Sequence, residues 1–312
     1  LTTGTPIENH LGELWNLFRF INPGLLGSLE HFNQRFALPI ERDQDLSARH
    51  RLKQLIQPFI LRRLKSQVLE ALPARTEILR RVELGPEEAA LYEALRQQAL
   101  ERLARVDDAD QQKSFQILAE IMKLRRACCH PRLALPGTDI SGAKLTAFED
   151  ILDELLENRH KALVFSQFVD HLAIIREVLD RKGVAYQYLD GSTPPNERKR
   201  NVDAFQAGQG DVFLISLKAG GLGLNLTAAD YVIHMDPWWN PAVEDQASDR
   251  AHRIGQQRPV TIYRLVAEGT IEEKIVALHH HKRDLAEQLL EGTGTSGRIS
   301  ADDLLRLLKE EA

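Results

Sequence analysis

The spacing of hydrophobic positions changes near residue 140. From Leu11 to about Gly137, apolar residues recur every three or four positions, as in LGELWNLFRFI, EEAALYEALRQQALERL and SFQILAEIMKLRRACC. This period places them on one face of a helix, so we predict a mostly helical region. The acidic stretch VDDADQQ is predicted to form the turn between the last two of these helices.

After Gly142, short apolar runs alternate with amphipathic segments. The predicted strands are KALVFSQF, VAYQYLD, DVFLISL, YVIHMD and VTIYRLV. Helices are predicted in AFEDILDELLEN, DHLAIIREVLDRKG, NERKRNVDAFQAG and TIEEKIVALHHHKRDLAEQLL, with a linker and a short helix at the end of the chain. Strands that alternate with helices indicate an α/β fold with a parallel sheet. Ligands of such sheets bind at the carboxyl ends of the strands.

Composition narrows the class of protein. With 312 residues, 43% hydrophobic and 27% charged, the chain is long enough for two globular domains. A net charge of -5 argues against broad attraction to nucleic acid, so any polyanion site has to be a local patch. Cys128 and Cys129 are adjacent, so a disulfide between them cannot join distant parts of the fold. This favours a reducing compartment. Without a membrane-length apolar run or a signal peptide, we expect a cytoplasmic protein with no membrane partner.

The stretch QASDRAHRIGQ, residues 246–256, follows a strong helix start. Asn240 is a preferred N-cap residue, and Pro241 is well tolerated at the first helical position. Gly255 supplies a stop. We therefore predict a helix from about 241 to 254.

On that helix Gln246, Arg250 and Arg253 would share one face. Two arginines and a glutamine do not make a core face. One interpretation is a solvated surface that is salt-bridged to the nearby Glu244 and Asp249. The other is an anion site, because guanidinium groups bind phosphate bidentately and neutralise charge on a transferred phosphoryl group. Spacing alone leaves both open.

Three predicted strand ends carry further candidate residues. VAYQYLD is followed by GSTPPNERKR, which contains a glycine, hydroxyls and a basic helix start. DVFLISL is followed by KAGGLGLNLTAAD, whose glycines let backbone N–H groups approach a phosphate, although a tight turn is the alternative. Donors around this loop are Ser216, Lys218 and Asn225. YVIHMD is followed by PWWNP, whose tryptophans either cover the core or stack on a base or sugar.

Two absences limit the chemistry. No GxxxxGK[ST] stretch occurs, so the arginines lack the nucleotide site that they would serve. No second ligand pair stands at zinc spacing from CCHP, and His279, His280 and His281 are consecutive, so their side chains fan around a helix. We expect no metal site in this chain.

These motifs together resemble the second half of the motor core of the Swi/Snf family, the helicase-like ATPases of chromatin remodelling and bacterial transcription recycling. LTTGTPIEN is similar to the family's third motif, ALVFSQF to motif IV, and YLDGST to the short motif after it. SLKAGGLGLNLTAADYVIHMDPWWNP resembles motif V, and DQASDRAHRIGQ resembles motif VI. FILRRLKSQVLEALPARTE matches the connector, and LRRACCHP matches the segment before the second lobe. The tail HKRDLAEQLLEG is more similar to prokaryotic members.

The resemblance implies a RecA-like parallel-sheet lobe flanked by helices and preceded by a mostly helical connector or protrusion. It divides the chain into the end of a first RecA-like lobe (1–22), the helical protrusion and connector (23–140), the second RecA-like lobe (141–290), and a linker with a brace helix (291–312). Because the chain opens inside the third motif, we expect it to be a piece of something longer.

The family's residue roles transfer to matching positions. Arg250 and Arg253 would be arginine fingers for ATP, which is held with Mg²⁺ mainly by the first lobe, and Gln246, Gly221 and Gly223 would help form the nucleotide site. The residues expected to follow the DNA backbone are Ser166, Gln167, Ser192, Thr193, Ser216, Lys218, Gly220, Gly221, Asn225 and Trp239. Thr2 and Lys218 depart from the family pattern; a lysine contacts phosphate, but not bidentately.

The implied activity is ATP-dependent translocation along double-stranded DNA. The implied partners are the duplex, the first lobe of the same chain, and RNA polymerase or another DNA-bound protein, in the nucleoid-associated cytoplasm. Two alternatives stay open: a superfamily 2 RNA or DNA helicase, and a non-catalytic module that binds nucleic acid or polymerase. The chain by itself is expected to hydrolyse negligible ATP and to bind duplex weakly and with salt sensitivity.

Overall fold

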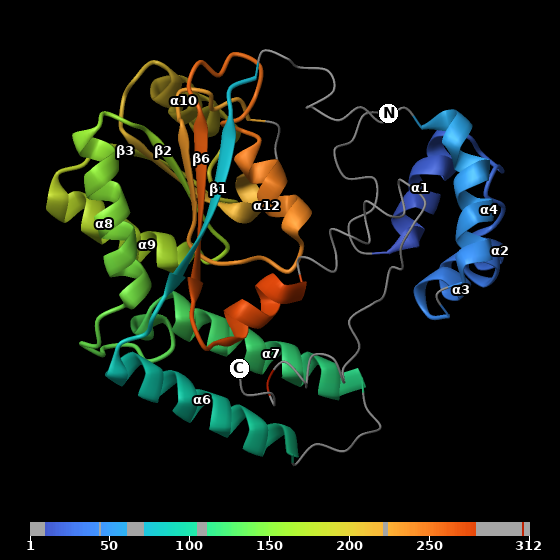
Figure 1. The fold of residues 1–312 in the computed structure, drawn as a ribbon, viewed down its shortest axis with the longest axis horizontal. Coiled ribbons are helices and arrows are strands. Elements are labelled where there is room, and N and C mark those ends of the chain that lie inside the picture. The colour runs from blue at the N-terminus through green and yellow to red at the C-terminus, as the bar shows by residue number, and fades with distance from the viewer. Residues whose placement is uncertain are drawn as a thin grey trace. The chain divides into compact units, whose positions relative to one another are not determined.

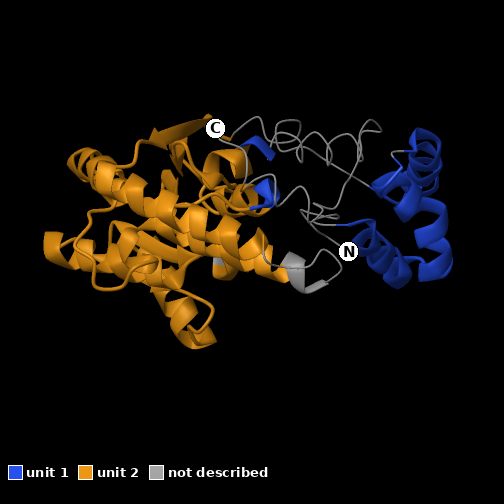
Figure 2. Ribbon diagram, turned by 90° about the horizontal axis from the view of Figure 1, so that it is seen from below, with its two compact units in different colours: residues 1–70, 239–242, 277–300 blue, residues 71–238, 243–276, 301–312 orange. Residues whose placement is uncertain are grey.

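The computed structural model describes residues 10–43, 45–60, 72–104, 111–220, 224–278 and 308. The chain divides into two compact units (Figure 2). Unit 1 comprises residues 1–70, 239–242 and 277–300, and unit 2 comprises residues 71–238, 243–276 and 301–312. Each unit has its own hydrophobic core.

Unit 1 is helical in its described part. Its elements are α1 (Leu11–Ile21), α2 (Leu29–Phe32), the π-helical turn η1 (Asn33–Ala37), α3 (Leu38–Glu41), α4 (Leu46–Ile56) and the 3-10 turn η2 (Gln57–Phe59). The apolar face predicted for LGELWNLFRFI is buried in α1, where Leu14 and Phe18 join the core. Asp45 caps α4 by accepting hydrogen bonds from the N–H groups of Ser47 and Ala48.

Unit 2 is built on a six-stranded sheet of order β1-β6-β5-β2-β4-β3 (Figure 1). The strands are β1 (Arg75–Val82), β2 (Ala162–Ser166), β3 (Tyr186–Leu189), β4 (Val212–Ser216), β5 (Tyr231–His234) and β6 (Val260–Ala267). All neighbouring strands pair in parallel. Their carboxyl ends therefore meet at one edge, which is the edge where α/β sheets bind ligands.

Helices cover both faces of the sheet, since side chains alternate along each strand. Val164 and Leu214 pack on one face with α8 (Ala143–Glu157) and α9 (Val169–Lys182). Phe165 and Phe213 pack on the other face with α10 (Pro195–Gln206) and α12 (Pro241–Ser248). Figure 1 shows α8 and α9 on one side of the sheet and α12 on the other. The predicted α/β fold is confirmed.

Two long helices, α6 (Pro86–Ala104) and α7 (Gln111–Cys129), pack against each other beside the sheet, followed by the short turn η3 (Pro131–Leu133). The hydroxyl of Tyr92 on α6 accepts a hydrogen bond from the N–H of Ile271, which follows β6. Within the described ranges, no helix combines the length and the apolar character that crossing a membrane requires.

The predicted strands and most predicted helices are present, and α9 ends at Gly183 with φ +67°, as its C-terminal glycine indicates. One element was missed. RTEILRRV lies in the region predicted to be helical, yet it forms β1 and pairs with β6 from Arg75↔Val260 to Val82↔Ala267. As an edge strand, β1 carries charges that hide its alternation.

Other predictions fall outside the described residues: the third motif, most of the connector between 61 and 71, the turn near 105–110, the three histidines and the C-terminal linker. The helix predicted from Thr270 onward is described over 271–278. The boundaries at 22, 140 and 290 remain predictions.

A buried ion pair fixes α8 to the carboxyl edge of the sheet. Lys144 and Glu272 contact each other with side chains that are 0% exposed. The Lys144 Nζ also donates to the carbonyl of Met235 at 2.9 Å, and Glu272 accepts from the N–H of Ala267 at 2.9 Å. Burial lowers the pKa of Lys144, but the carboxylate of Glu272 outweighs it and raises the pKa. The pair thus joins the loops that follow β5 and β6.

We predict that Lys144→Met destabilises the protein by about 3–5 kcal/mol, because it leaves a buried carboxyl without its cation. Burial then raises the pKa of Glu272 further, because only the bond from the N–H of Ala267 still opposes it strongly. An acid whose folded-state pKa is raised loses stability as pH rises, so the loss should be larger at pH ~8 than at pH ~5. Urea unfolding of the variant at both pH values measures this.

The matched control is Lys182→Met, which removes an exposed ion pair with Asp153. It should change the free energy of unfolding by less than about 1 kcal/mol. Equal losses in the two variants would contradict the buried-pair account.

Candidate nucleotide and nucleic-acid site

The turn after β3 presents two of the predicted DNA-binding residues. The Asp190 carboxylate accepts hydrogen bonds from the N–H and hydroxyl of Ser192, at 2.8 and 2.6 Å, and from the N–H of Thr193 at 3.1 Å. Tyr188 donates to its other oxygen at 2.8 Å. Burial pushes the pKa of Asp190 up, but these bonds outweigh it and hold the pKa low. Asp190 was missed, although Asp before Gly-Ser-Thr is an Asx-turn signal.

The loop after β2 is tied to the loop after β5. Ser166 donates to Asp236 at 2.5 Å, and the N–H of Gln167 donates to the same carboxylate at 3.3 Å. The N–H of Phe168 donates to the Ser166 hydroxyl. Ser166 is 1% exposed and Ser216 is 4% exposed. A DNA contact by either hydroxyl would require its loop to open, whereas Gln167 is partly exposed.

The loop after β4 supplies an exposed cation at this edge. Lys218 is exposed on the short helix α11 (Leu217–Gly220). Gly220 ends that helix, while Gly221 and Gly223 lie outside the described residues. Ser192, Thr193, Gln167 and Lys218 thus all follow carboxyl ends of parallel strands, as predicted for ligand-binding loops.

The predicted helix 241–254 is shorter than expected. Its start is confirmed, because Asn240 accepts a hydrogen bond from the N–H of Ala242 at 3.0 Å, but α12 ends at Ser248. Beyond Ser248 two carbonyls accept hydrogen bonds that do not belong to a helix. The Arg250 carbonyl accepts from the N–H of Leu226, and the Ala251 carbonyl accepts from the side chain of Gln256. Arg250 and Arg253 therefore lie on a turn after the helix, and they do not share a helical face with Gln246.

The two arginines nevertheless form a concentrated positive site. Arg250 is 7% exposed, and its Nε makes no hydrogen bond to the described residues. Burial lowers the pKa of Arg250, and the nearby Arg253 lowers it further. Arg253 is exposed, with its Nη1 3.4 Å from the carbonyl of Leu224. Asp249 raises the pKa of Arg250 in turn, so the net effect of its neighbours and burial is a lowered pKa that a bound anion would reverse.

The arginine turn and the Lys218 loop lie toward opposite edges of the sheet. The arginine turn leads into the amino end of β6. Asp230 lies at the same edge, because it comes just before β5 and its N–H donates to the carbonyl of Lys161, just before β2. Asn225 is exposed and belongs to the segment that leads to Asp230, so it lies on the side of the amino edge. The predicted site residues thus form two separate groups.

Buried ion pairs fix α12 and the arginine turn against the sheet. Arg264 on β6 donates to Glu244 at 2.8 Å, to Asp245 at 3.0 Å, and to Glu77 on β1 at 2.5 Å. Burial lowers the pKa of Arg264, but Glu244 and Glu77 outweigh it and raise the pKa. Arg75 of β1 lies 3.2 Å from Asp245. The missed strand β1 is therefore part of the support of the site.

Gln256 holds the far end of the turn. Its Nε2 donates to the carbonyls of Thr227, Ala229 and Ala251 at 3.2, 2.8 and 3.0 Å. Because it is 7% exposed, these bonds are sheltered from water. Its place as the last residue of QASDRAHRIGQ was the available signal.

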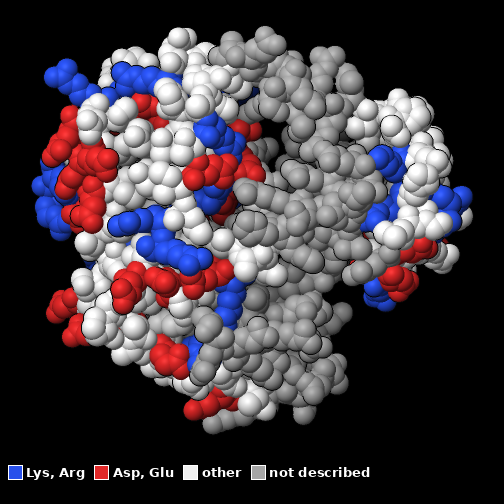
Figure 3. Space-filling model, viewed as in Figure 1, with Lys and Arg blue, Asp and Glu red and all other residues white. Residues whose placement is uncertain are grey.

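Charged side chains of both signs are interspersed over the face of unit 2 seen in Figure 3. The exposed positive groups near the predicted site include Lys199 and Arg200 on α10, Lys218, and Arg253. This distribution agrees with a net charge of -5 and with a local polyanion site.

Trp239 is half-buried, and its predicted DNA contact stays a prediction. Trp238 is also half-buried. Its backbone N–H donates to Glu244 at 2.7 Å, and its ring centroid lies 5.6 Å from the central carbon of the Arg125 guanidinium.

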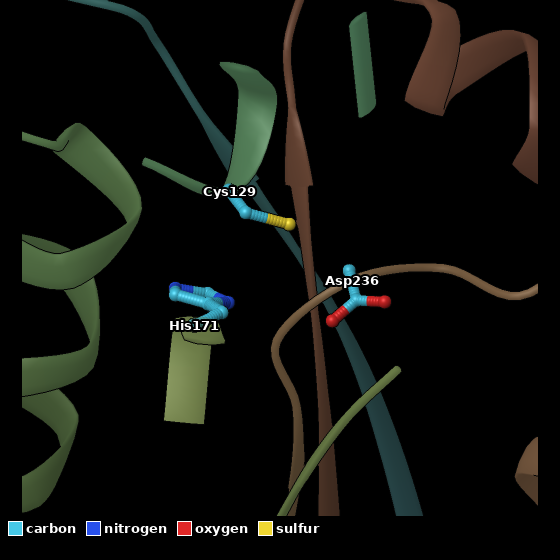
Figure 4. A group of neighbouring side chains, drawn as sticks. All are labelled: Cys129, His171 and Asp236. Atoms are coloured by element: carbon cyan, nitrogen blue, oxygen red, sulfur yellow. The ribbon is translucent and has the colours of Figure 1, made fainter. Parts of the chain in front are cut away.

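Cys129, His171 and Asp236 place three potential metal-binding atoms within 4.8 Å of one another (Figure 4). Both ring nitrogens of His171 make no hydrogen bond to described residues, and burial lowers its pKa to about 3. The Asp236 carboxylate already accepts from Ser166 and lies 3.9 Å from Arg125, which opposes a metal ion. Burial raises the pKa of the Cys129 thiol. We interpret the group as a packed polar cluster.

Comparison with known proteins identifies two families in the chain. The SNF2-related domain matches residues 1–133, and the helicase conserved C-terminal domain matches residues 143–255. The second match contains the Lys218 loop, α12 and Arg253.

Relatives of known name match nearly all of this chain. An "uncharacterized ATP-dependent helicase" of Mycoplasma pneumoniae is 40% identical over 309 residues, covering 98% of this chain and 29% of the relative. The "putative ATP-dependent helicase/translocase YwqA" of Bacillus subtilis is 39% identical, covering 98% of this chain and 34% of the relative. The chain thus spans about a third of the length of these curated relatives.

Solved structures agree. The Sulfolobus solfataricus SWI2/SNF2 ATPase core in complex with dsDNA is 35% identical with a TM-score of 0.63, covering 99% of this chain and 66% of that one. The C-terminal domain of the same ATPase gives a TM-score of 0.60 at 29% identity, covering 76% of this chain and 99% of that one. The chain therefore belongs to the Swi/Snf family, and its parallel-sheet unit is a RecA-like lobe of the kind found in Swi/Snf ATPases.

Proposed function

We propose that this chain is the C-terminal part of a DNA-dependent ATPase that translocates along double-stranded DNA. The observation that carries the proposal is the arginine turn. Arg253 follows Arg250 by three residues in the same turn, and the Nε of Arg250 is buried without a hydrogen bond to described residues. The turn follows a helix that Arg264 anchors to the sheet. Such a rigid pair of guanidinium groups suits a γ-phosphate that is presented by another lobe.

The nucleotide itself would bind mainly to a first RecA-like lobe of the same protein, together with Mg²⁺. In support, the chain has no GxxxxGK[ST] stretch, and its relatives are about three times as long. Arg253 would neutralise charge on the transferred phosphoryl group, while Arg250 and Gln246 would hold the nucleotide site. The chain alone would then hydrolyse negligible ATP.

The DNA would lie along the carboxyl edge of the sheet. Lys218, Ser192 and Thr193 would contact phosphates there, and phosphate contacts position a protein on a duplex without reading its sequence. The solved SWI2/SNF2 core from Sulfolobus solfataricus, which is in complex with dsDNA, supports a duplex over RNA. Gln167 and Trp239 remain proposed contacts, as does Asn225, whose neighbours Leu224 and Leu226 bond to the arginine turn.

A strand-separating helicase and a non-catalytic binding module are the competing functions. A translocase displaces the third strand of a triplex but leaves duplex strands paired, whereas a helicase separates them. A module without turnover does neither. The target of the motor, whether RNA polymerase or another DNA-bound protein in the nucleoid, remains a prediction.

In the complete two-lobe motor, Arg253→Ala is expected to reduce ATP turnover by about 10³-fold, because an arginine finger acts on transition-state charge. Duplex affinity should change little, since Lys218, Ser192 and Thr193 follow the opposite edge of the sheet from the arginine turn. A coupled ATPase assay and fluorescence anisotropy measure the two.

Arg258→Ala is the matched control. Arg258 follows in the same segment, and its exposed side chain pairs with Asp230 at 3.3 Å. Its loss should leave turnover near wild type, since surface pairs contribute little. If ATP turnover falls equally in Arg253→Ala and Arg258→Ala, the assignment of Arg253 as an arginine finger is wrong.

Lys218→Ala should weaken duplex binding by this chain and reduce the slope of log affinity against log salt by about 1, because one phosphate contact releases about one counterion. Anisotropy titrations at several salt concentrations give the slope. Lys182→Ala on α9 is the control and should leave the slope unchanged. An unchanged slope for Lys218→Ala would remove this residue from the interface.

A further inference from the structure

Arg125 on α7 is a fully buried cation outside the site described above. Its side chain is 0% exposed. It donates to the side-chain carbonyl of Gln167 at 3.1 Å and to the backbone carbonyl of Pro237 at 2.5 Å, and it lies 3.9 Å from the carboxylate of Asp236. Gln167 follows β2, whereas Pro237 and Asp236 follow β5. One guanidinium thus contacts two loops from neighbouring strands.

Aromatic rings from the same two loops enclose this guanidinium. The carbon at its centre lies 5.8 Å from the ring of Phe168 and 5.6 Å from the ring of Trp238. A desolvated cation at this distance is attracted to the face of an aromatic ring. We call the group of Arg125, Gln167, Asp236, Pro237 and Trp238 the loop clamp.

The clamp requires an arginine for a physical reason. The planar guanidinium donates in several fixed directions at once, whereas an ammonium group is a point charge on a flexible stem. Without Arg125, the Asp236 carboxylate would lose its buried cation, and the side-chain carbonyl of Gln167 would lose its donor. Leaving buried groups unpaired is costly, so the two loops would rearrange.

The loop clamp also connects with α12, the helix that precedes the arginine turn. The N–H of Trp238 donates to Glu244, and Glu244 accepts from Arg264 at 2.8 Å. Because Glu244 keeps its bond to Arg264 when the loop after β5 moves, α12 and the arginine turn stay anchored.

We propose that Arg125 is a positioning residue for DNA engagement. It locks residues 166–168 and 236–238 into one arrangement, so that α7 and these DNA-side loops move as one rigid body. The inference rests on the proposed function, because it assumes that this edge of the sheet binds a duplex. A merely structural role would affect stability and leave the affinity for DNA alone.

The test compares Arg125→Met and Arg125→Lys in the complete motor. The readouts are the duplex concentration that half-saturates ATP turnover and the turnover at saturating duplex. Both variants should raise the half-saturating concentration by about tenfold or more, because a charge-assisted hydrogen-bonded contact is lost, with a much smaller change in maximal turnover. Arg132→Met, which removes the exposed pair with Glu177, is the control and should change neither.

A folded Arg125→Lys protein with wild-type half-saturation would overturn the proposal, as would an equal fall of turnover at all duplex concentrations. If Arg125→Met does not fold, the Arg125→Lys variant tests the proposal alone. It keeps a positive charge beside Asp236 but lacks the planar guanidinium that donates in several directions.

Hydrogen exchange separates failure of the clamp from failure of the proposed function. Amides of residues 166–168 and 236–238 should exchange faster in Arg125→Lys than in Arg132→Met. If duplex does not stimulate even the wild-type motor, the proposed function is wrong, and unchanged exchange in Arg125→Lys then refutes the clamp as well.

Discussion

The Arg264 guanidinium donates hydrogen bonds to carboxylates of α12 and β1 from its buried position on β6. Burying a charge is costly unless it is paired and hydrogen-bonded, so α12 has to lie where Glu244 and Asp245 reach this group. That placement fixes the turn after α12, and with it Arg250 and Arg253. The same constraint explains why an edge strand with a charged sequence belongs to the sheet: Glu77 supplies the third carboxylate.

Two groups of functional candidates are held by one rigid sheet. The arginine turn lies toward the amino edge, and the loops with Gln167, Ser192 and Lys218 leave the carboxyl edge. A sheet with both faces packed transmits displacement well, because its interior has few voids. An ATP-driven movement at the arginine turn would therefore carry the DNA-side loops with it, which is the mechanical requirement of a translocase.

The sequence predicts the elements better than the details of the site. Strong hydrophobic runs such as DVFLISL and capped helices such as α9 follow from local pattern alone, and the motif order identified the family. The failures have tertiary causes. β1 is disguised by its charges, and α12 ends early because Leu226 and Gln256 take the carbonyls that would continue the helix. Arg125 lies in the predicted helix SFQILAEIMKLRRACC, and only the packed structure shows it buried between two loops.

The most direct test of the central claim is ATP hydrolysis by the complete two-lobe motor with no nucleic acid, duplex DNA, single-stranded DNA or RNA. A translocase on double-stranded DNA predicts that duplex DNA stimulates turnover most strongly. Strongest stimulation by single strands or RNA would contradict that account and favour a helicase, and absence of hydrolysis under every condition would leave a binding module on a motor fold.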